Sequence, residues 1–116
     1  MTAMRLLAAA ALGLFLSACD FQKEADAKFG DQHFKTAIAL IELHKVRQGS
    51  YPATLKDLQF TGEWDAIALS AVEYTKLEQG YELYVTRGWV GQPKLSYPRE
   101  FWQGLGVVKS NLKAGT

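Results

Sequence analysis

Cys19 is the only cysteine in this chain of 116 residues, and its surroundings limit the chemistry that its thiol can do. It follows an apolar run over residues 6–16 and the small residues Ser17 and Ala18, while Arg5 is the one ionisable side chain before it. A single cysteine excludes a disulfide within the chain. The sulfur is therefore available as a nucleophile that can form a thioether. A basic residue, followed by an apolar run and then by small residues, predicts a secretory signal.

The length of the apolar run separates a removable signal from a permanent membrane span. As a helix, residues 6–16 would extend about 17 Å at ~1.5 Å per residue. The hydrocarbon core of a bilayer is roughly 30 Å thick and needs about twenty apolar residues. We therefore expect residues 1–18 to be a cleaved signal peptide. Met1 and Met4 are both suitable start sites, and either start leaves the same signal.

The segment Leu16-Ser17-Ala18-Cys19 resembles the lipobox of bacterial lipoproteins, in which a leucine and two small residues precede an essential cysteine. In that family the thiol receives a diacylglyceryl group, a dedicated peptidase cuts before the cysteine, and the new amine is usually acylated. The resemblance implies cleavage between Ala18 and Cys19, and membrane lipid held through Cys19. Two or three acyl chains would anchor firmly, because each buried methylene contributes about 0.8 kcal/mol. Ordinary cleavage to a free exported protein is the alternative.

Asp20 follows the expected lipid-acceptor cysteine directly. In enteric bacteria an aspartate at this position resembles the signal that retains a lipoprotein in the inner membrane. The resemblance therefore implies a lipid-anchored protein of the cell envelope that faces the periplasm, on the inner membrane. The outer membrane is the alternative location.

Two other groups of residues invite a chemical interpretation. His33 and His44 are eleven residues apart, which is roughly 16 Å along a helix, whereas a zinc–nitrogen bond is ~2 Å long. We expect surface or helix-boundary histidines and no metal site. Glu63 and Asp65 flank Trp64, and paired carboxylates beside an aromatic ring occur in sugar chemistry. Two acids so spaced are common in loops, and we expect a solvated loop.

Known catalytic motifs and a strong charge bias are both missing from the sequence. It has no Gly-x-Ser-x-Gly elbow, phosphate loop, zinc-binding helix motif or dinucleotide fingerprint. Removing Arg5 with the signal leaves 12 of the 13 basic residues against 12 acidic residues. A neutral chain gives no electrostatic reason to bind nucleic acid. We expect no enzymatic activity, no catalytic residues, no cofactor and no nucleic-acid partner.

Aromatic side chains are numerous for a mature chain of 98 residues (116 − 18). A chain of that size forms one domain with one core. We expect most of the aromatic rings in that core. Trp89 and Trp102 are the candidates for surface positions that contact a partner, because tryptophan often dominates binding sites.

A helix is the strongest secondary-structure prediction. Apolar residues at three- and four-residue steps place it between Asp31, as the N-cap, and Gly49, as the C-terminal stop. Its apolar stripe comprises Phe34, Ala37, Ile38 and Ile41, widened by Leu40, Leu43 and Val46. Residues 19–30 are mostly charged and small, and we expect a lipidated tether there that can prolong the helix. The single domain is then residues 31–116.

Beyond the helix, the pattern changes to short turns and strands. Thr54 with Asp57 predicts a capped helical turn, and residues 60–70 are ambiguous between a loop, a strand and a short helix. Residues 71–89 predict an antiparallel hairpin. A turn at Gln79-Gly80 pairs Tyr74 with Val85, and a three-residue loop with a bulge is the alternative. Residues 94–97 and 105–108 are the further strand candidates.

The link Gly49-Ser50-Tyr51-Pro52 after a helix, followed by an antiparallel meander, resembles type IV pilins and the major pseudopilins of type II secretion. The resemblance covers residues 37–58. It implies a pilin-like α+β fold, with an N-terminal helix packed on a small antiparallel sheet. A generic small α+β domain is the alternative.

The sequence departs from the pilin pattern at both ends. A lipid-acceptor cysteine replaces the prepilin-peptidase site, and residues 21–30 are polar where pilins continue as a long apolar helix. Major pseudopilins bind calcium through acids near the C-terminus, but Glu100 is the only carboxylate side chain after Glu82, and calcium takes six to eight oxygens. We therefore expect neither a filament subunit nor a calcium site.

These features together predict a non-catalytic lipoprotein that binds another envelope protein, such as a component of a secretion or pilus system. A periplasmic inhibitor or immunity lipoprotein, which neutralises a toxin or hydrolase, is the alternative. A small enzyme that acts on a small ligand or on peptidoglycan is the third hypothesis. A convex aromatic patch would favour the first two, and a pocket with convergent polar groups would favour the third.

Overall fold

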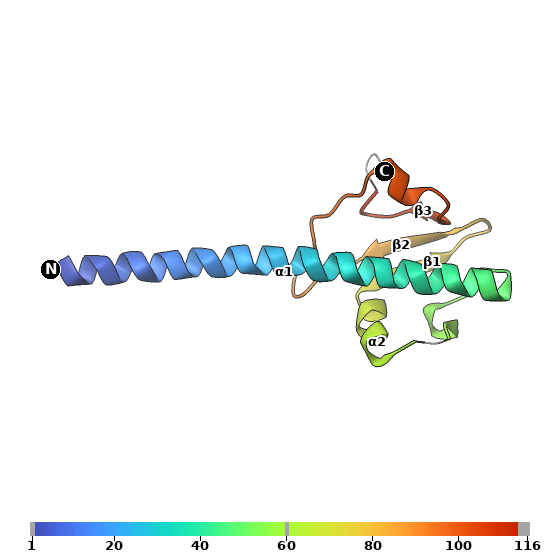
Figure 1. Ribbon diagram of the computed structural model, residues 1–116, viewed down its shortest axis with the longest axis horizontal. Coiled ribbons are helices and arrows are strands. Elements are labelled where there is room, and N and C mark those ends of the chain that lie inside the picture. The colour runs from blue at the N-terminus through green and yellow to red at the C-terminus, as the bar shows by residue number, and fades with distance from the viewer. Residues whose placement is uncertain (1, 60, 114–116) are drawn as a thin grey trace.

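The computed structural model describes the backbone of residues 2–59 and 61–113, and the side chains of residues 20–59 and 61–113. One long helix, α1 (Thr2–Gln48), carries a small domain on its C-terminal half (Figure 1). The other elements are η1 (Leu55–Asp57), α2 (Glu63–Ser70), β1 (Val72–Lys76), β2 (Tyr81–Val85), η2 (Arg99–Trp102) and β3 (Val107–Lys109). The predicted α+β class, with an N-terminal helix packed on a small sheet, is confirmed.

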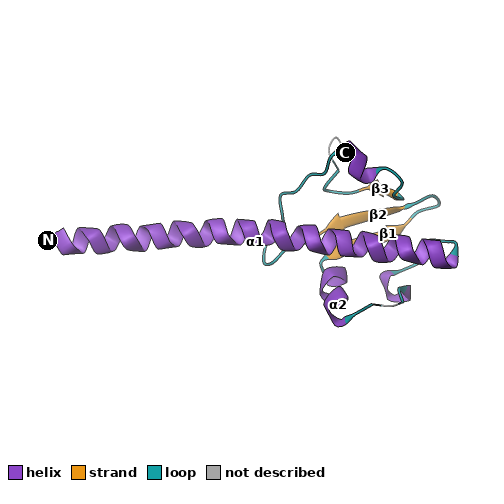
Figure 2. Ribbon diagram, viewed as in Figure 1, coloured by secondary structure: helices purple, strands orange, loops and turns teal. Residues whose placement is uncertain are grey.

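The sheet has the strand order β1-β2-β3 and is mixed (Figure 2). Strands β1 and β2 pair antiparallel as predicted, but β3 pairs parallel to β2. The expectation of a wholly antiparallel sheet is therefore wrong at its third strand. A parallel pair requires a long crossover connection, and residues 86–106 provide it. Residues 94–97, predicted as a strand, lie within this crossover without joining the sheet.

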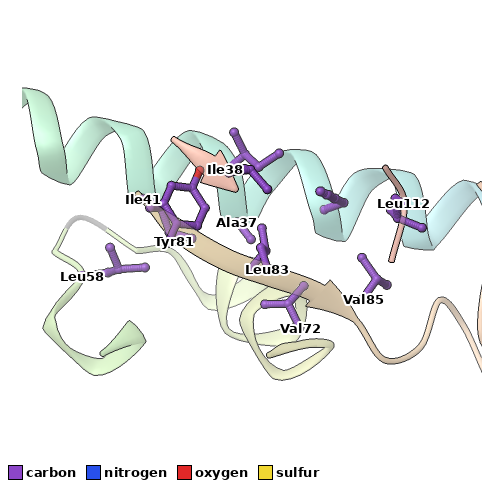
Figure 3. Packing of buried hydrophobic residues seen from close by; sticks show 11 residues of the cluster. Ala37, Ile38, Ile41, Leu58, Val72, Tyr81, Leu83, Val85 and Leu112 are labelled. Atoms are coloured by element: carbon purple, nitrogen blue, oxygen red, sulfur yellow. The ribbon is translucent and has the colours of Figure 1, made fainter. Parts of the chain in front are cut away.

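The core lies between α1 and the sheet (Figure 3). Phe34 and Ile41 of α1 are fully buried, as are Tyr81 and Leu83 of β2, which confirms the predicted apolar stripe. The predicted widening of the stripe fails at Val46, which is 80% exposed. On an ideal helix Val46 points about 140° away from Ile41, so the sheet cannot cover both. Leu43, about 160° from Ile41, is exposed for the same reason.

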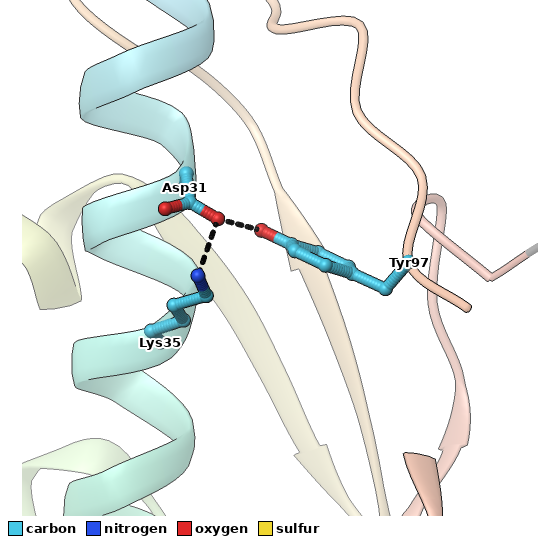
Figure 4. Close-up of polar contacts among 3 residues, drawn as sticks. All are labelled: Asp31, Lys35 and Tyr97. Atoms are coloured by element: carbon cyan, nitrogen blue, oxygen red, sulfur yellow. Dashed lines mark hydrogen bonds and ion pairs between the residues drawn. The ribbon is translucent and has the colours of Figure 1, made fainter. Parts of the chain in front are cut away.

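Helix α1 ends where the sequence predicts but begins earlier. Gly49 follows its last residue with φ 85°, a conformation that glycine adopts readily. Asp31 is not an N-cap, because α1 already runs through residues 20–30. Its carboxylate instead accepts a hydrogen bond from the Tyr97 hydroxyl at 2.7 Å and pairs with Lys35 at 3.1 Å (Figure 4).

The hairpin has the predicted apolar face in a different register. Val72 lies opposite Val85 and Tyr74 opposite Leu83, two residues away from the predicted pairing. The chain reverses before Gly80, which has φ 83° and whose carbonyl accepts the Leu77 N–H at 3.0 Å. Because side chains alternate with a period of two, a shift of two residues leaves each side chain on its face.

The segment between α1 and the hairpin contains two short helical pieces. The Thr54 N–H donates to Asp57 at 3.1 Å, which agrees with the predicted capped turn at η1. Helix α2 begins at Glu63, so the loop expected at Glu63 and Asp65 is wrong, although Glu63 is exposed to solvent as expected. The Asp65 carboxylate accepts the Gly62 N–H at 2.7 Å and thereby satisfies a free donor at the start of α2.

Candidate functional site

A cavity of about 280 Å³ lies between α1, α2 and the loop that follows β2. We call it the α1–α2 groove. Its residues are Phe29, Gln32, His33, Thr36, Trp64, Asp65, Ile67, Ala68, Arg87, Gly88 and Trp89. Trp64 is 82% exposed and Trp89 is 49% exposed, with Phe29 and Ile67 also exposed. Large apolar side chains gathered around a hollow are typical of an interaction site.

The polar groups of the groove are bonded within the protein. Arg87 donates to the Ser70 hydroxyl at 2.7 Å, and Asp65 accepts the Gly62 N–H. His33 forms a hydrogen bond with the Gly88 backbone. The groove therefore presents mainly apolar surface, with its ionisable groups engaged in holding the walls.

His33 lies under the loop after β2 and is only 8% exposed, so the predicted surface or helix-boundary position is wrong. Loop residues Arg87 and Gly88 cover this face of α1, and no sequence periodicity indicates such a cover. Burial lowers the pKa of His33 below its usual 6.5, the Gly88 backbone bond partly opposes this, and the Arg87 charge adds to the lowering. The imidazole is therefore neutral at pH 7.

The two histidines do not meet. His44 lies near the other end of α1, where its Nδ1 is 2.9 Å from the Ser50 carbonyl. Among the residues whose side chains are described, no group of three or more His, Cys, Asp or Glu is placed to hold a metal ion.

Asp26 fixes the loop that carries Trp89. One oxygen of its carboxylate accepts three consecutive backbone N–H groups, from Trp89 at 2.9 Å, Val90 at 2.7 Å and Gly91 at 2.9 Å. The bonds from Val90 and Gly91 are the main cause that lowers the pKa of Asp26. Gly88 makes the approach possible, because an added Cβ would lie 2.6 Å from the Asp26 carbonyl carbon. We call this arrangement the Asp26 clamp.

A second carboxylate, the half-buried Glu42, joins the helix to the sheet. Glu42 accepts the hydroxyl of Tyr81 at 3.0 Å, the hydroxyl of Tyr51 at 3.0 Å and the N–H of Gly106 at 2.8 Å. Burial and the Glu42 carboxylate raise the pKa of Tyr51 to about 12. The sequence contains a signal for this role, since Glu42 follows Ile38 by four residues and therefore adjoins the buried stripe.

The two tryptophans predicted to contact a partner lie in separate clusters. Trp89 borders the groove, but Trp102 is half-buried and packs edge-on against Phe34, with ring centroids 5.7 Å apart. Sequence reasoning did not select Trp64 as a partner-binding residue, although it is the most exposed tryptophan of the three. Its acidic neighbours were a signal that the residue faces water.

The predicted signal, the cleavage site at Ala18 and Cys19, and the lipid attachment concern side chains outside those that the structure describes. Asp20, the predicted sorting residue, is exposed. None of the helices in the described part of the chain combines the length and the apolar character needed to cross a bilayer.

Known protein families, characterised proteins and solved structures give no significant match to this chain.

Proposed function

We propose that this chain is a lipid-anchored, non-catalytic protein of the bacterial cell envelope that binds another envelope protein through the α1–α2 groove. The anchor is supported by Leu16-Ser17-Ala18-Cys19, which resembles a lipobox, and by the short apolar run before it. The binding role is supported by the exposed aromatic rim of the groove. This rim is the single observation that carries the proposal.

The chemistry of the groove favours binding over catalysis. Its acid, base and guanidinium groups are Asp65, His33 and Arg87, and each of them bonds to another part of the same domain. A catalytic site needs polar groups that converge on a substrate. Here Trp64 and Ile67 project from α2 instead, and they supply the kind of apolar contact area that interface centres use.

The helix exit supports a pilin-like domain as part of the proposal. Gly49 ends α1, the Tyr51 ring packs against Tyr81 with centroids 4.9 Å apart, and Pro52 is fully buried. The pilin resemblance rests on this same Gly49-Ser50-Tyr51-Pro52 link. The domain would be the soluble head alone, mounted on lipid.

The anchor is tested by labelling cells with radioactive palmitate. Wild-type protein is expected to incorporate label, and Cys19→Ser is expected to incorporate none. Equal labelling of both proteins, or of neither, would contradict the lipid anchor.

The groove is tested by placing a photoreactive amino acid at Trp64 or Ile67 in intact cells, with Val46 as the control position. Val46 is 80% exposed and lies outside the groove. We expect one defined adduct from both groove positions and none from Val46. The same adducts from all three positions, or no adduct from the groove, would contradict the proposal. The adduct's identity separates an envelope component from a toxin or hydrolase.

A further inference from the structure

An exposed apolar cluster that shares Trp89 with the border of the α1–α2 groove lies at the end of the domain that is nearest to Cys19. Phe21 is 62% exposed and Val90 is 63% exposed, with Trp89 between them. The Phe21 and Trp89 rings meet edge-on, with centroids 5.8 Å apart. We call Phe21, Trp89 and Val90 the anchor-proximal cluster. It joins the start of the mature helix to the loop after β2.

The Asp26 clamp holds this cluster on the surface. Three successive N–H groups bond to one carboxylate oxygen, and Gly88 N–H donates to the Gly91 carbonyl at 2.8 Å. Successive N–H groups that point at one anion form a compact and well-defined loop. The clamp thus fixes the backbone so that the Trp89 and Val90 side chains remain exposed. Their apolar area is in contact with water unless an apolar phase covers it.

The position of the cluster indicates what covers it. Cys19 precedes Phe21 by two residues in the same helix, a rise of about 3 Å, and it precedes Asp26 by about 10 Å. The loop after β2 reaches α1 at the edge of the domain that faces the N-terminus (Figure 1). A headgroup layer is about 5–8 Å thick on each side of a bilayer. Acyl chains on Cys19 would therefore place Phe21, and the Trp89 ring that contacts it, at headgroup depth.

The charges near the cluster favour apolar contact over electrostatic attraction. Asp20, Lys23 and Glu24 are exposed on this part of α1 and carry mixed signs. Binding driven by charge would require a group of basic residues. Tryptophan and phenylalanine, in contrast, are the side chains that prefer the boundary between headgroups and acyl chains.

We propose that Phe21, Trp89 and Val90 insert into the headgroup region of the leaflet that carries the Cys19 lipid, and that they fix the orientation of the domain on that membrane. The partner of this surface is the phospholipid bilayer itself. The inference rests on the proposed lipid anchor. It adds a second, non-covalent contact that sets how the α1–α2 groove faces the periplasm.

The test uses the full-length lipidated protein in phosphatidylcholine vesicles whose acyl chains are brominated near the headgroup. Trp64→Phe and Trp102→Phe leave Trp89 as the only tryptophan, and excitation at a wavelength that tyrosine hardly absorbs selects its fluorescence. We expect bromine to quench Trp89 at least about twofold more than the single tryptophan of a matched protein that carries Trp89→Phe and Val46→Trp. Position 46 lies roughly 38 Å beyond Phe21 along the helix. Equal quenching of the two probes would overturn the proposal.

Matched variants separate insertion from simple proximity. Phe21→Ser with Val90→Ser should reduce the quenching of Trp89, whereas Val46→Ser with Val108→Ser should leave it unchanged. The second pair also removes two exposed apolar side chains, and it lies away from the anchor. Circular dichroism checks that every variant is folded. An unchanged signal in the first pair would overturn the proposal.

The same samples distinguish this inference from the proposed function. Palmitate label in the protein together with an unquenched Trp89 would refute insertion and leave the anchor intact. Absence of label would refute the anchor. Strong quenching of Trp89 only when phosphatidylglycerol is present would refute the apolar mechanism, because the mixed charges here predict no requirement for anionic lipid.

Discussion

Removal of the Glu42 carboxylate should loosen the joint between helix and sheet. This side chain accepts bonds from Tyr51 near the helix exit, from Tyr81 on β2 and from Gly106 before β3. Glu42→Ala deletes the shared acceptor of all three donors. The buried Tyr81 hydroxyl then loses the only hydrogen-bond acceptor that it has in the described structure.

The expected loss follows from the burial of these donors. A buried donor left without an acceptor costs about 1–3 kcal/mol. The Tyr81 side chain is fully buried and Gly106 is half-buried, while the partly exposed Tyr51 hydroxyl can turn to water. Two donors then give a loss of about 3 kcal/mol in the free energy of unfolding for Glu42→Ala. Glu42→Gln keeps one acceptor oxygen, and its loss should be about 1 kcal/mol.

Urea unfolding followed by circular dichroism measures these differences. Glu73→Ala on β1 is the control, because that acid is exposed, and its effect should stay within about 0.5 kcal/mol. Tyr81→Phe removes the buried donor, so it should recover about 1 kcal/mol of the loss when combined with Glu42→Ala. A loss below about 1 kcal/mol for Glu42→Ala, or strict additivity in the double variant, would refute this reasoning.

Three further predictions concern the groove and the tyrosines. Gly88→Ala should lower the free energy of unfolding by about 2 kcal/mol, measured by urea unfolding, because its methyl group meets the Asp26 backbone. Burial lowers the pKa of His33, so the free energy of unfolding should fall as the pH drops below 6.5. Unfolding curves at pH 5 and pH 7 measure this fall, and His33→Gln should reduce it. Burial raises the pKa values of Tyr51 and Tyr74 to about 12 each, so stability should hold below pH 10 and fall between pH 10 and 12. Thermal unfolding at pH 9 and 11 checks this, and Tyr51→Phe should reduce the fall.

Local patterns in the sequence predicted the elements whose signals are themselves local. The periodic spacing of Phe34, Ala37 and Ile41 identifies a helix and its buried face, and Gly49 marks its end. The alternation along β1 and β2 identifies the buried face of the hairpin. The register requires the detailed turn geometry at Gly80, and the residue types there fit more than one turn.

Long-range pairings were beyond the reach of these patterns. Strand β3 has three residues, and its parallel pairing with Tyr81 depends on how the crossover returns. Asp31 has the chemistry of an N-cap, but its partner Tyr97 lies 66 residues away.

At the candidate site, too, local features could be predicted from the sequence and long-range contacts could not. Trp89 was selected as a surface aromatic from its type, but the same reasoning selected the half-buried Trp102. The Asp26 clamp could not be found, because its donors are backbone N–H groups that every residue except proline possesses. Trp64 lies in a stretch that the sequence left open between a loop, a strand and a short helix, so its outward projection from α2 was missed.

The continuity of α1 has a mechanical consequence. From Cys19 to Gln48 the helix has no break, and a helix of that length is about 45 Å long. A lipoprotein on a disordered linker explores a wide volume around its attachment point, whereas a domain on an unbroken rod sweeps little space. With Cys19 lipidated as proposed, this protein would meet only partners that come within a few nanometres of the bilayer.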